Sequence, residues 1–162
     1  MKRVIVIGSP GSGKSVLARK LREKTGLPLV SLDNVWWKPD RTHITQREFD
    51  ERLAGILEKD EWIIDGSYSR TFEPRFAACD TVILLDYDAD VCLRGIADRV
   101  GQARPDIPWT EQSLDPELVD LVKTYRERNL PTIRELFRRY ADRETHVFHD
   151  RDEAQRWLDS LQ

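Results

Sequence analysis

The sequence predicts an α/β fold in which a five-stranded parallel sheet carries helices on both faces. Residues 4–7, "VIVI", form a continuous β-branched run, which is typical of a parallel strand covered on both sides. Four further short apolar runs alternate with helical patterns along the chain, and this alternation requires right-handed crossovers between parallel strands. With 162 residues, the chain is long enough to bury a core of its own, so we expect a single domain over residues 1–162.

The first strand leads into a predicted helix with a clear end. Leu17, Ala18 and Leu21 recur at helical spacing. Gly26 is a good helix stop, and Pro28 follows just beyond it. The run "PLVSL", which begins at Pro28, then predicts the second strand.

A capping box predicts the start of the next helix, because Thr45 and Glu48 have the spacing that lets each cap the other's backbone. Apolar residues after it continue on one helical face, so we expect a helix from about Gln46 to Lys59. The remaining strands are predicted from three short apolar runs, at residues 62–65 ("WIID"), 81–86 ("TVILLD") and 146–148 ("HVF").

A long irregular stretch interrupts the second half of the chain. Residues 101–113, "GQARPDIPWTEQS", contain two prolines and no periodicity, which indicates a mobile excursion more than a linker between domains. We expect a small lid over about residues 99–115. A helix is predicted beyond it from the spacing of Leu118, Val119, Leu121 and Val122. Pro131 is expected to open a second helix, which would carry Ile133, Leu136 and Phe137.

Composition makes several classes of protein improbable. The net charge of -3 and the isoelectric point near 5.7 lack the basic excess that favours nucleic acid, so nucleic acid is an unlikely partner. The opening apolar run is too short to span a bilayer and has no signal-peptide cleavage site, so we expect no membrane attachment and a cytoplasmic location. Cys79 and Cys92 lack metal-site spacing and are expected to be reduced structural thiols.

The strongest functional signal is "GSPGSGKS", which matches the GxxxxGK(S/T) pattern and lies directly between the first strand and the first helix. Its glycines allow backbone conformations that turn N–H groups toward a phosphate, and the helix adds its positive end. We therefore predict a P-loop NTPase fold that binds a nucleoside triphosphate. The predicted phosphate-binding residues are Gly8, Ser9, Pro10, Gly11, Ser12, Gly13, Lys14 and Ser15.

The last two residues of this loop have distinct predicted roles. Lys14 can reach the β- and γ-phosphates as a point charge, which makes it a catalytic candidate. Ser15 offers a hydroxyl ligand to Mg²⁺, a cation that prefers a few oxygen ligands and keeps water.

Three acids follow predicted strands, at Asp33, Asp65 and Asp86. In an open parallel sheet these carboxyl ends form the ligand crevice. Asp65 is the candidate for holding the water shell of Mg²⁺, and Asp33 for orienting an acceptor hydroxyl or taking its proton. The alternative is that such acids cap the following turn or helix, and we assign Asp86 to this structural use.

Arginines gather around the predicted lid, at Arg94, Arg99, Arg104, Arg126 and Arg128. Guanidinium groups carried by a closing lid would stabilise the charge that develops on a transferring phosphoryl group. Arg99 and Arg104 are the catalytic candidates among them. A solvated charged surface is the alternative for any single one.

Two adjacent tryptophans, Trp36 and Trp37, follow Asp33 toward the same crevice. They are substrate-binding candidates, because their rings could stack on a flat or sugar-like ligand. The alternative is that they pack the following helix onto the sheet.

With the P-loop, "LDNVWW", "WIIDGSYSR" and an arginine-bearing lid in this order, the chain resembles the adenylate kinase superfamily of small P-loop kinases over nearly its full length. Including "RPDIP" of the lid, it is most similar to the adenylate-kinase-like family named DNA topology modulation proteins. The resemblance implies that ATP is the donor, that Asp65 supports Mg²⁺ and that Arg70 binds an acceptor phosphate. Shikimate and gluconate kinases are similar in using an acid after strand two to hold an acceptor hydroxyl, and Asp33 occupies such a position.

We therefore predict a kinase that transfers a phosphoryl group from ATP, with Mg²⁺, to a small-molecule acceptor. The acceptor could be a nucleoside, a nucleotide or another hydroxyl compound. "GSYSR" stands where adenylate kinases have Gly-Phe-Pro-Arg, which favours a hydroxyl-bearing or nucleoside-like acceptor over AMP. The alternative is a nucleotide-gated regulatory protein that affects DNA topology or a protein partner and hydrolyses ATP slowly.

Overall fold

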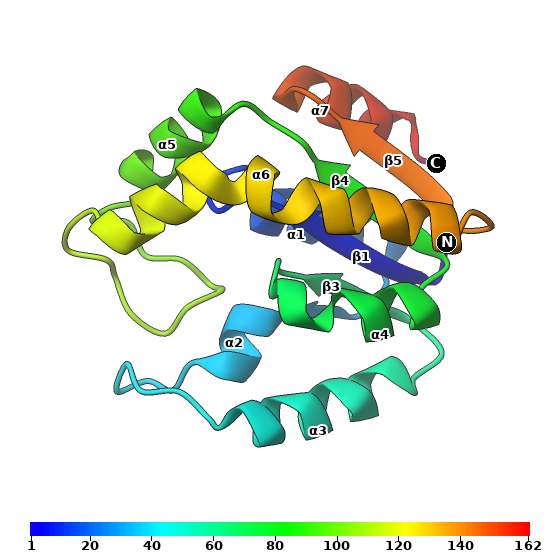
Figure 1. Cartoon of the computed structure of the whole chain (residues 1–162), viewed down its shortest axis with the longest axis horizontal. Helices are drawn as coiled ribbons and strands as arrows, with labels where there is room; N and C mark the ends of the chain where they lie inside the picture. The colour runs from blue at the N-terminus through cyan, green and yellow to red at the C-terminus, as the bar shows by residue number, and fades with distance from the viewer.

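The computed structural model describes residues 1 to 162 and contains the predicted five-stranded parallel sheet. The strand order is β2-β3-β1-β4-β5, so the β-branched first strand lies in the centre (Figure 1). A strand in this position is covered on both faces, which is why its apolar run is continuous. The strands are β1 (Arg3–Gly8), β2 (Leu29–Ser31), β3 (Trp62–Asp65), β4 (Thr81–Leu85) and β5 (Glu144–Phe148).

Helices cover both faces of this sheet and complete a three-layer α/β fold (Figure 1). The fold class is therefore confirmed. In chain order the helices are α1 (Lys14–Thr25), α2 (Leu32–Trp36), α3 (Gln46–Leu57), the short 3₁₀ helix η1 (Ser69–Thr71), α4 (Phe72–Ala78), α5 (Ala89–Asp98), α6 (Pro116–Arg139) and α7 (Arg151–Ser160).

Alternate residues of β1 enter two separate hydrophobic cores. Val4 and Val6 are fully buried in the core that includes residues of α1, α5 and α7. Ile5 and Ile7 are fully buried in the core that includes residues of α3, α4 and α6. Because successive side chains of a strand point to opposite faces, one apolar run supplies both cores.

The capping signals in the sequence correctly predict where two helices begin or end. Gly26 adopts the left-handed conformation (φ 72°) after α1, and its N–H donates to the Arg22 carbonyl at 2.8 Å. The Thr45 hydroxyl accepts from the Glu48 N–H at 3.1 Å, which caps α3. The short helix α2 is not predicted by the sequence, because its five residues are too few to show helical periodicity. Asp33 lies in the first turn of this helix.

The prediction that Pro131 opens a second helix is wrong, because α6 continues through it from Pro116 to Arg139. Pro131 cannot donate to the carbonyl of Glu127, but both residues are exposed and water can satisfy that carbonyl. The residues Leu130 and Ile133, on the buried side, hold the helix against the sheet on either side of the proline. Tertiary packing thus outweighs the local preference for a break.

The predicted lid segment, residues 99–115, contains neither helix nor strand and lies beside α2 (Figure 1). The Asn34 side-chain amide donates to the Pro105 carbonyl at 3.1 Å. The rings of Trp37 and Trp109 meet edge to face, with their centroids 5.1 Å apart. These contacts place the segment over the carboxyl end of the sheet.

Both cysteines are buried free thiols, and burial raises the pKa of Cys79 to about 11 and also raises that of Cys92. The thiolate is the reactive form, so we expect neither residue to react with a thiol-specific reagent in the native protein at pH 8. Titration with such a reagent, before and after addition of denaturant, measures this. Rapid labelling of the folded chain would contradict it.

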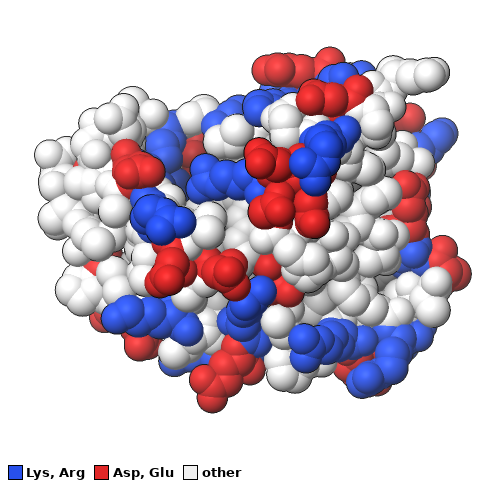
Figure 2. All heavy atoms as spheres, turned by 90° about the horizontal axis from the view of Figure 1, so that it is seen from above, with Lys and Arg blue, Asp and Glu red and all other residues white.

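Charges of both signs are interspersed on the face of the molecule that Figure 2 shows, without a continuous basic stripe. None of the helices combines the length and the apolar character that crossing a bilayer requires.

Candidate active site

The P-loop joins β1 to α1 at the carboxyl edge of the sheet. Gly11 and Gly13 have φ angles of 78° and 92°, in the left-handed region that L side chains rarely adopt. The Ser12 N–H donates to the Ser9 carbonyl at 3.1 Å and closes the loop. The backbone N–H groups between β1 and the first turn of α1 are therefore arranged to surround an anion.

Lys14 curls back over this loop, where its Nζ donates to the Ser9 carbonyl at 2.9 Å. Burial lowers the pKa of Lys14, while the carboxylates of Asp65 and Asp33 raise it. The ammonium group thus lies between the phosphate cradle and two acids.

Ser15 and Asp65 form the second part of the site. The Ser15 hydroxyl donates to Asp65 Oδ2 at 2.6 Å. Asp65 ends β3 and is only 3% exposed, and this burial raises its pKa to about 6 against the opposing effects of Lys14 and Ser15. Its Oδ1 is buried without a hydrogen-bond partner. An orphaned carboxylate oxygen beside a hydroxyl fits the few oxygen ligands that Mg²⁺ takes from protein, so these two residues could hold the ion.

Asp33 lies across the same crevice, in the first turn of α2. Its Oδ1 accepts a hydrogen bond from the Tyr68 hydroxyl at 2.6 Å. Burial raises the pKa of Tyr68, and Asp33 raises it further, so the phenol stays protonated and acts as the donor. Tyr68 therefore fixes the orientation of the Asp33 carboxylate.

A cavity of about 330 Å³ connects these groups. Six of the predicted site residues line this cavity, namely Pro10, Lys14, Ser15, Asp33, Asp65 and Arg99. Arg128, one of the arginines expected around the lid, also lines it. So do residues that were not among the site candidates, including Tyr68, Asp106, Tyr125 and Asn129. The structure thus brings the P-loop, two strand-end acids and one lid arginine to a single cavity.

The other predicted lid arginine, Arg104, does not line this cavity. It pairs with Asp106 at 3.3 Å and with Glu111 at 3.7 Å, inside the lid itself. Arg99 also pairs with Glu111, at 3.3 Å. The shared carboxylate of Glu111 holds the two guanidinium groups together.

Three further predicted substrate-binding residues lie outside the cavity. Trp36 stacks on His43, with ring centroids 4.3 Å apart, and Trp37 packs on Trp109. Trp36 also meets Phe49 of α3 edge to face, with ring centroids 5.6 Å apart, which matches the packing alternative, whereas Trp37 contacts the lid segment and not the following helix. Arg70 forms a two-pronged ion pair with Asp50, at 2.7 and 3.1 Å, on the surface between η1 and α3.

The residue that organises this part of the site is Arg75, which sequence reasoning missed. It is fully buried in α4, and burial lowers its pKa to about 10. Its guanidinium donates to the Gly66 carbonyl at 2.8 Å and to the Ser67 carbonyl. It thereby holds the segment between β3 and η1 that lines the cavity. The sequence pattern that could have indicated a buried Arg75 is its position on the same helical face as Phe72 and Cys79.

Asp86 has a structural contact, but it is an ion pair rather than the cap of the following turn or helix that the sequence suggested. Arg126 of α6 donates to Asp86 at 2.8 Å and to Asp88 at 3.0 Å. This pairing ties α6 to the turn after β4. Arg94 is exposed on α5 and does not line the cavity.

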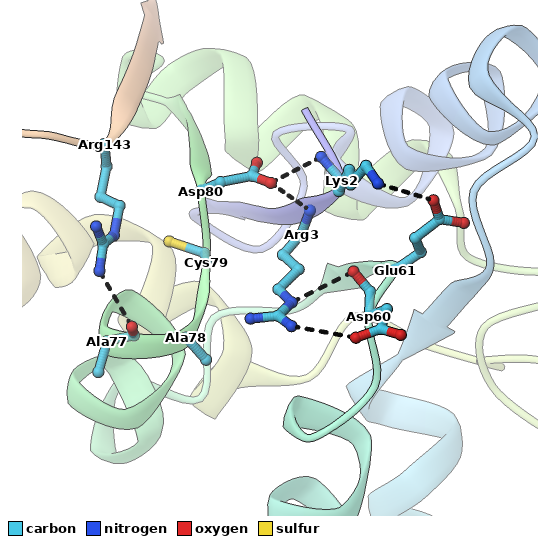
Figure 3. A pocket seen from close by; sticks show the side chains of 9 residues that line it. All are labelled: Lys2, Arg3, Asp60, Glu61, Ala77, Ala78, Cys79, Asp80 and Arg143. Carbon is cyan, nitrogen blue, oxygen red and sulfur yellow. Dashed lines mark hydrogen bonds and ion pairs between the residues drawn. The ribbon is translucent and has the colours of Figure 1, made fainter.

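A larger hollow of about 740 Å³ lies at the opposite, amino edge of the sheet (Figure 3). There the N–H groups of Lys2 and Arg3 donate to the Asp80 carboxylate, at 2.8 and 3.0 Å. The other charged groups in it are also paired with one another or with backbone carbonyls, namely Asp60, Glu61 and Arg143. With its charges satisfied and no P-loop nearby, this hollow is a poor candidate for catalysis.

Comparison with known proteins finds similar adenylate kinase sequences and similar solved structures, although no protein-family model matches the chain. Adenylate kinase from Thermotoga neapolitana is 29% identical over 91 residues, which cover 53% of this chain and 39% of that enzyme. The chain thus matches less than half the length of that relative. Adenylate kinase from Mycobacterium ulcerans is 27% identical over 158 residues, which cover 81% of this chain and 83% of the enzyme.

Two solved structures resemble the whole chain. Shikimate kinase from Bacteroides thetaiotaomicron has a TM-score of 0.61 and 19% identity, over 99% of this chain and 96% of that one. Shikimate kinase from Acinetobacter baumannii, solved with shikimate, has a TM-score of 0.63 and 15% identity, over 99% of this chain and 91% of that one. The chain has the three-layer P-loop NTPase fold. The similarity to proteins named for DNA topology modulation stays a prediction.

Proposed function

We propose that this protein is an ATP-dependent and Mg²⁺-dependent kinase that transfers a phosphoryl group to a hydroxyl group of a small molecule. The observation that carries the proposal is the single cavity that Lys14, the Ser15–Asp65 pair and Asp33 share. A phosphate cradle next to a carboxylate that has no ion-pair partner suits group transfer, because donor and acceptor can meet in one cavity. The adenylate kinase relatives and the shikimate kinase structures support the same class of reaction.

The donor half of the site would bind the triphosphate of ATP. The P-loop N–H groups and the positive end of α1 would surround the phosphates, and Lys14 would move from the Ser9 carbonyl to the phosphate oxygens. Arg99 lines the same cavity and would stabilise negative charge on the transferring group. Bound Mg²⁺ would neutralise phosphate charge, with Ser15 and Asp65 holding it directly or through water.

The acceptor half depends on Asp33. A hydroxyl oxygen of the acceptor forms the new bond to the γ-phosphorus, while the bond from that phosphorus to the β-γ bridging oxygen breaks and ADP leaves. Asp33 orients the hydroxyl and accepts its proton as the bond forms. Tyr68 acts as a positioning residue, because its hydrogen bond to Asp33 Oδ1 leaves Oδ2 available to the acceptor.

Asp33→Asn is expected to lower kcat/KM for the acceptor by about 100-fold, because asparagine can still orient the hydroxyl but cannot accept its proton. Affinity for ATP should stay unchanged, because Asp33 lies on the acceptor side. Acceptor titrations at saturating ATP, together with direct nucleotide binding, measure the two effects separately. Asp90→Asn, at an exposed position of α5, is the matched control. Equal activity of Asp33→Asn and wild type would return Asp33 to a purely capping role.

The proposal as a whole is tested by a coupled assay of ADP release against nucleosides, nucleoside monophosphates and hydroxy compounds, with phosphorylated products identified by mass spectrometry. We expect release that depends on both Mg²⁺ and one acceptor class. ATP-dependent binding of DNA with no phosphorylated product would contradict the proposal and favour the regulatory alternative.

A further inference from the structure

The arginines beside the acceptor half of the cavity lie next to carboxylates. Arg99 is 3.3 Å from Glu111, and Arg104 is 3.3 Å from Asp106, although the Nε atoms of both arginines make no hydrogen bond. The exposed Arg128 contacts Asp120 at 3.6 Å, a contact that water screens. The neighbouring acids partly neutralise Arg99 and Arg104, so an acceptor anion would have to compete with Glu111 and Asp106 for them.

Arginines on the β3 side of the cavity are also committed elsewhere. Arg70 holds Asp50 with two hydrogen bonds and does not line the cavity. Arg75 is fully buried and uses its guanidinium on backbone carbonyls, including that of Gly66. The bidentate fork that recognises an acceptor phosphate is therefore missing from this wall.

Carboxylates, in contrast, do face the cavity. Asp33 has no ion-pair partner within 4 Å, and its one hydrogen bond comes from the uncharged hydroxyl of Tyr68. Asp106 reaches the cavity from the lid, is 5% exposed and lies 3.3 Å from Arg104. Asp65 also lines the cavity, but its free Oδ1 is the atom assigned to Mg²⁺ on the donor side. The oxygens of Asp33 and Asp106 can accept hydrogen bonds from hydroxyl or amino groups, and the unpaired charge of Asp33 repels anions.

The rest of the acceptor wall is neutral. Tyr125 and Ser67 lie within 3.3 Å of each other through their hydroxyl oxygens, and the Asn129 amide donates to the Tyr125 carbonyl. Leu118 and Leu121 add apolar surface from the same helix, α6. Such a wall suits the carbon skeleton of a compound whose hydroxyl groups turn toward the acids.

We propose that the acceptor is an uncharged or cationic hydroxyl compound without a phosphate or carboxylate group, and that Asp106 contributes to this selection from the lid. The inference rests on the proposed kinase activity and narrows its substrate class. Asp106 acts in two ways, because it presents a negative charge to the acceptor and neutralises Arg104. Removing its charge would both reduce repulsion of anions and release a guanidinium group.

Matched pairs of acceptors that differ in one charged group test the substrate class. We would compare shikimate with its methyl ester, and glucuronate with its methyl ester, by acceptor-dependent ADP release and product mass. The neutral member of whichever pair is phosphorylated should have a kcat/KM at least about tenfold higher, because an anion beside the unpaired carboxylate of Asp33 is repelled. A preference for the anionic member would overturn the inference while leaving the kinase activity established.

Asp106→Asn tests the role of the lid acid, with Asp98→Asn at an exposed position of α5 as the matched control. The variant should raise the ratio of anionic to neutral kcat/KM by at least about fivefold, whereas the control should leave it unchanged. A residue that only supports the lid would lower both rates in equal proportion, and that result would overturn the role of Asp106. If neither member of any pair releases ADP although ATP binds, the proposed function itself fails.

Discussion

Lys14→Ala is expected to lower ATP turnover by about 1000-fold or more, because it removes the one ammonium group that reaches the phosphates from inside the P-loop. The charge of Lys14 acts in a buried environment, where electrostatic interactions are less screened than in water. Nucleotide binding by titration and ADP release in the coupled assay measure the loss.

The fold should survive this substitution, since Lys14 makes one hydrogen bond, to the Ser9 carbonyl, and does not belong to either hydrophobic core. Lys14→Met would retain the apolar stem and remove only the charge, so it should be as inactive as Lys14→Ala. Lys59→Ala, at an exposed position after α3, is the control and should behave as wild type. Phosphoryl transfer at the wild-type rate in Lys14→Met would rule out the assigned role.

The parts of this molecule that follow from the sequence are those encoded by contiguous residues. The P-loop is one uninterrupted motif between a strand and a helix, so its glycines, Lys14 and Ser15 could be assigned together. The sheet was predictable for a similar reason, because four strands contain a short apolar run, whereas the edge strand β5 is mostly exposed and only its end, residues 146–148, was predicted. Asp33 and Asp65 could be expected near the P-loop because parallel strands align their carboxyl ends.

The parts that could not be predicted depend on which distant residue becomes a neighbour. Arg70 lies close in sequence to the acceptor side of the site, but Asp50 of α3 binds it on the surface. Arg75 belongs to no recognisable sequence motif, although its hydrogen bonds hold the backbone that follows β3. Pro131 locally disfavours a continuous helix, but the packing of α6 outweighs this preference. Each outcome is decided by tertiary contacts between elements, which local patterns do not encode.

Another such contact joins the P-loop to α5, the helix that leads into the lid segment. A Cβ atom added to Gly11 would lie 2.1 Å from the Cys92 carbonyl oxygen, and one added to Gly95 would lie 2.0 Å from the Gly11 carbonyl oxygen. The two backbones therefore touch with no room for a side chain. The position of the phosphate-binding N–H groups thus depends on how closely α5 approaches.

Gly95→Ala is accordingly expected to weaken ATP binding and lower kcat/KM for ATP by about 100-fold, because a displacement of the P-loop by about an ångström misplaces its donors. Overpacking against backbone should also reduce the free energy of unfolding by about 1–3 kcal/mol. Chemical denaturation and nucleotide titration measure the two effects.

The matched control is Gly55→Ala, since Gly55 also lies inside a helix, α3, but an added Cβ there meets nothing within 4 Å. It should stabilise the protein by about 0.5–1 kcal/mol through the better helix propensity of alanine, with unchanged kinetics. Because the two substitutions are chemically identical, any difference between them reports the contact with the P-loop rather than the loss of a glycine. Normal ATP affinity in a folded Gly95→Ala protein would show that the P-loop adjusts independently of α5.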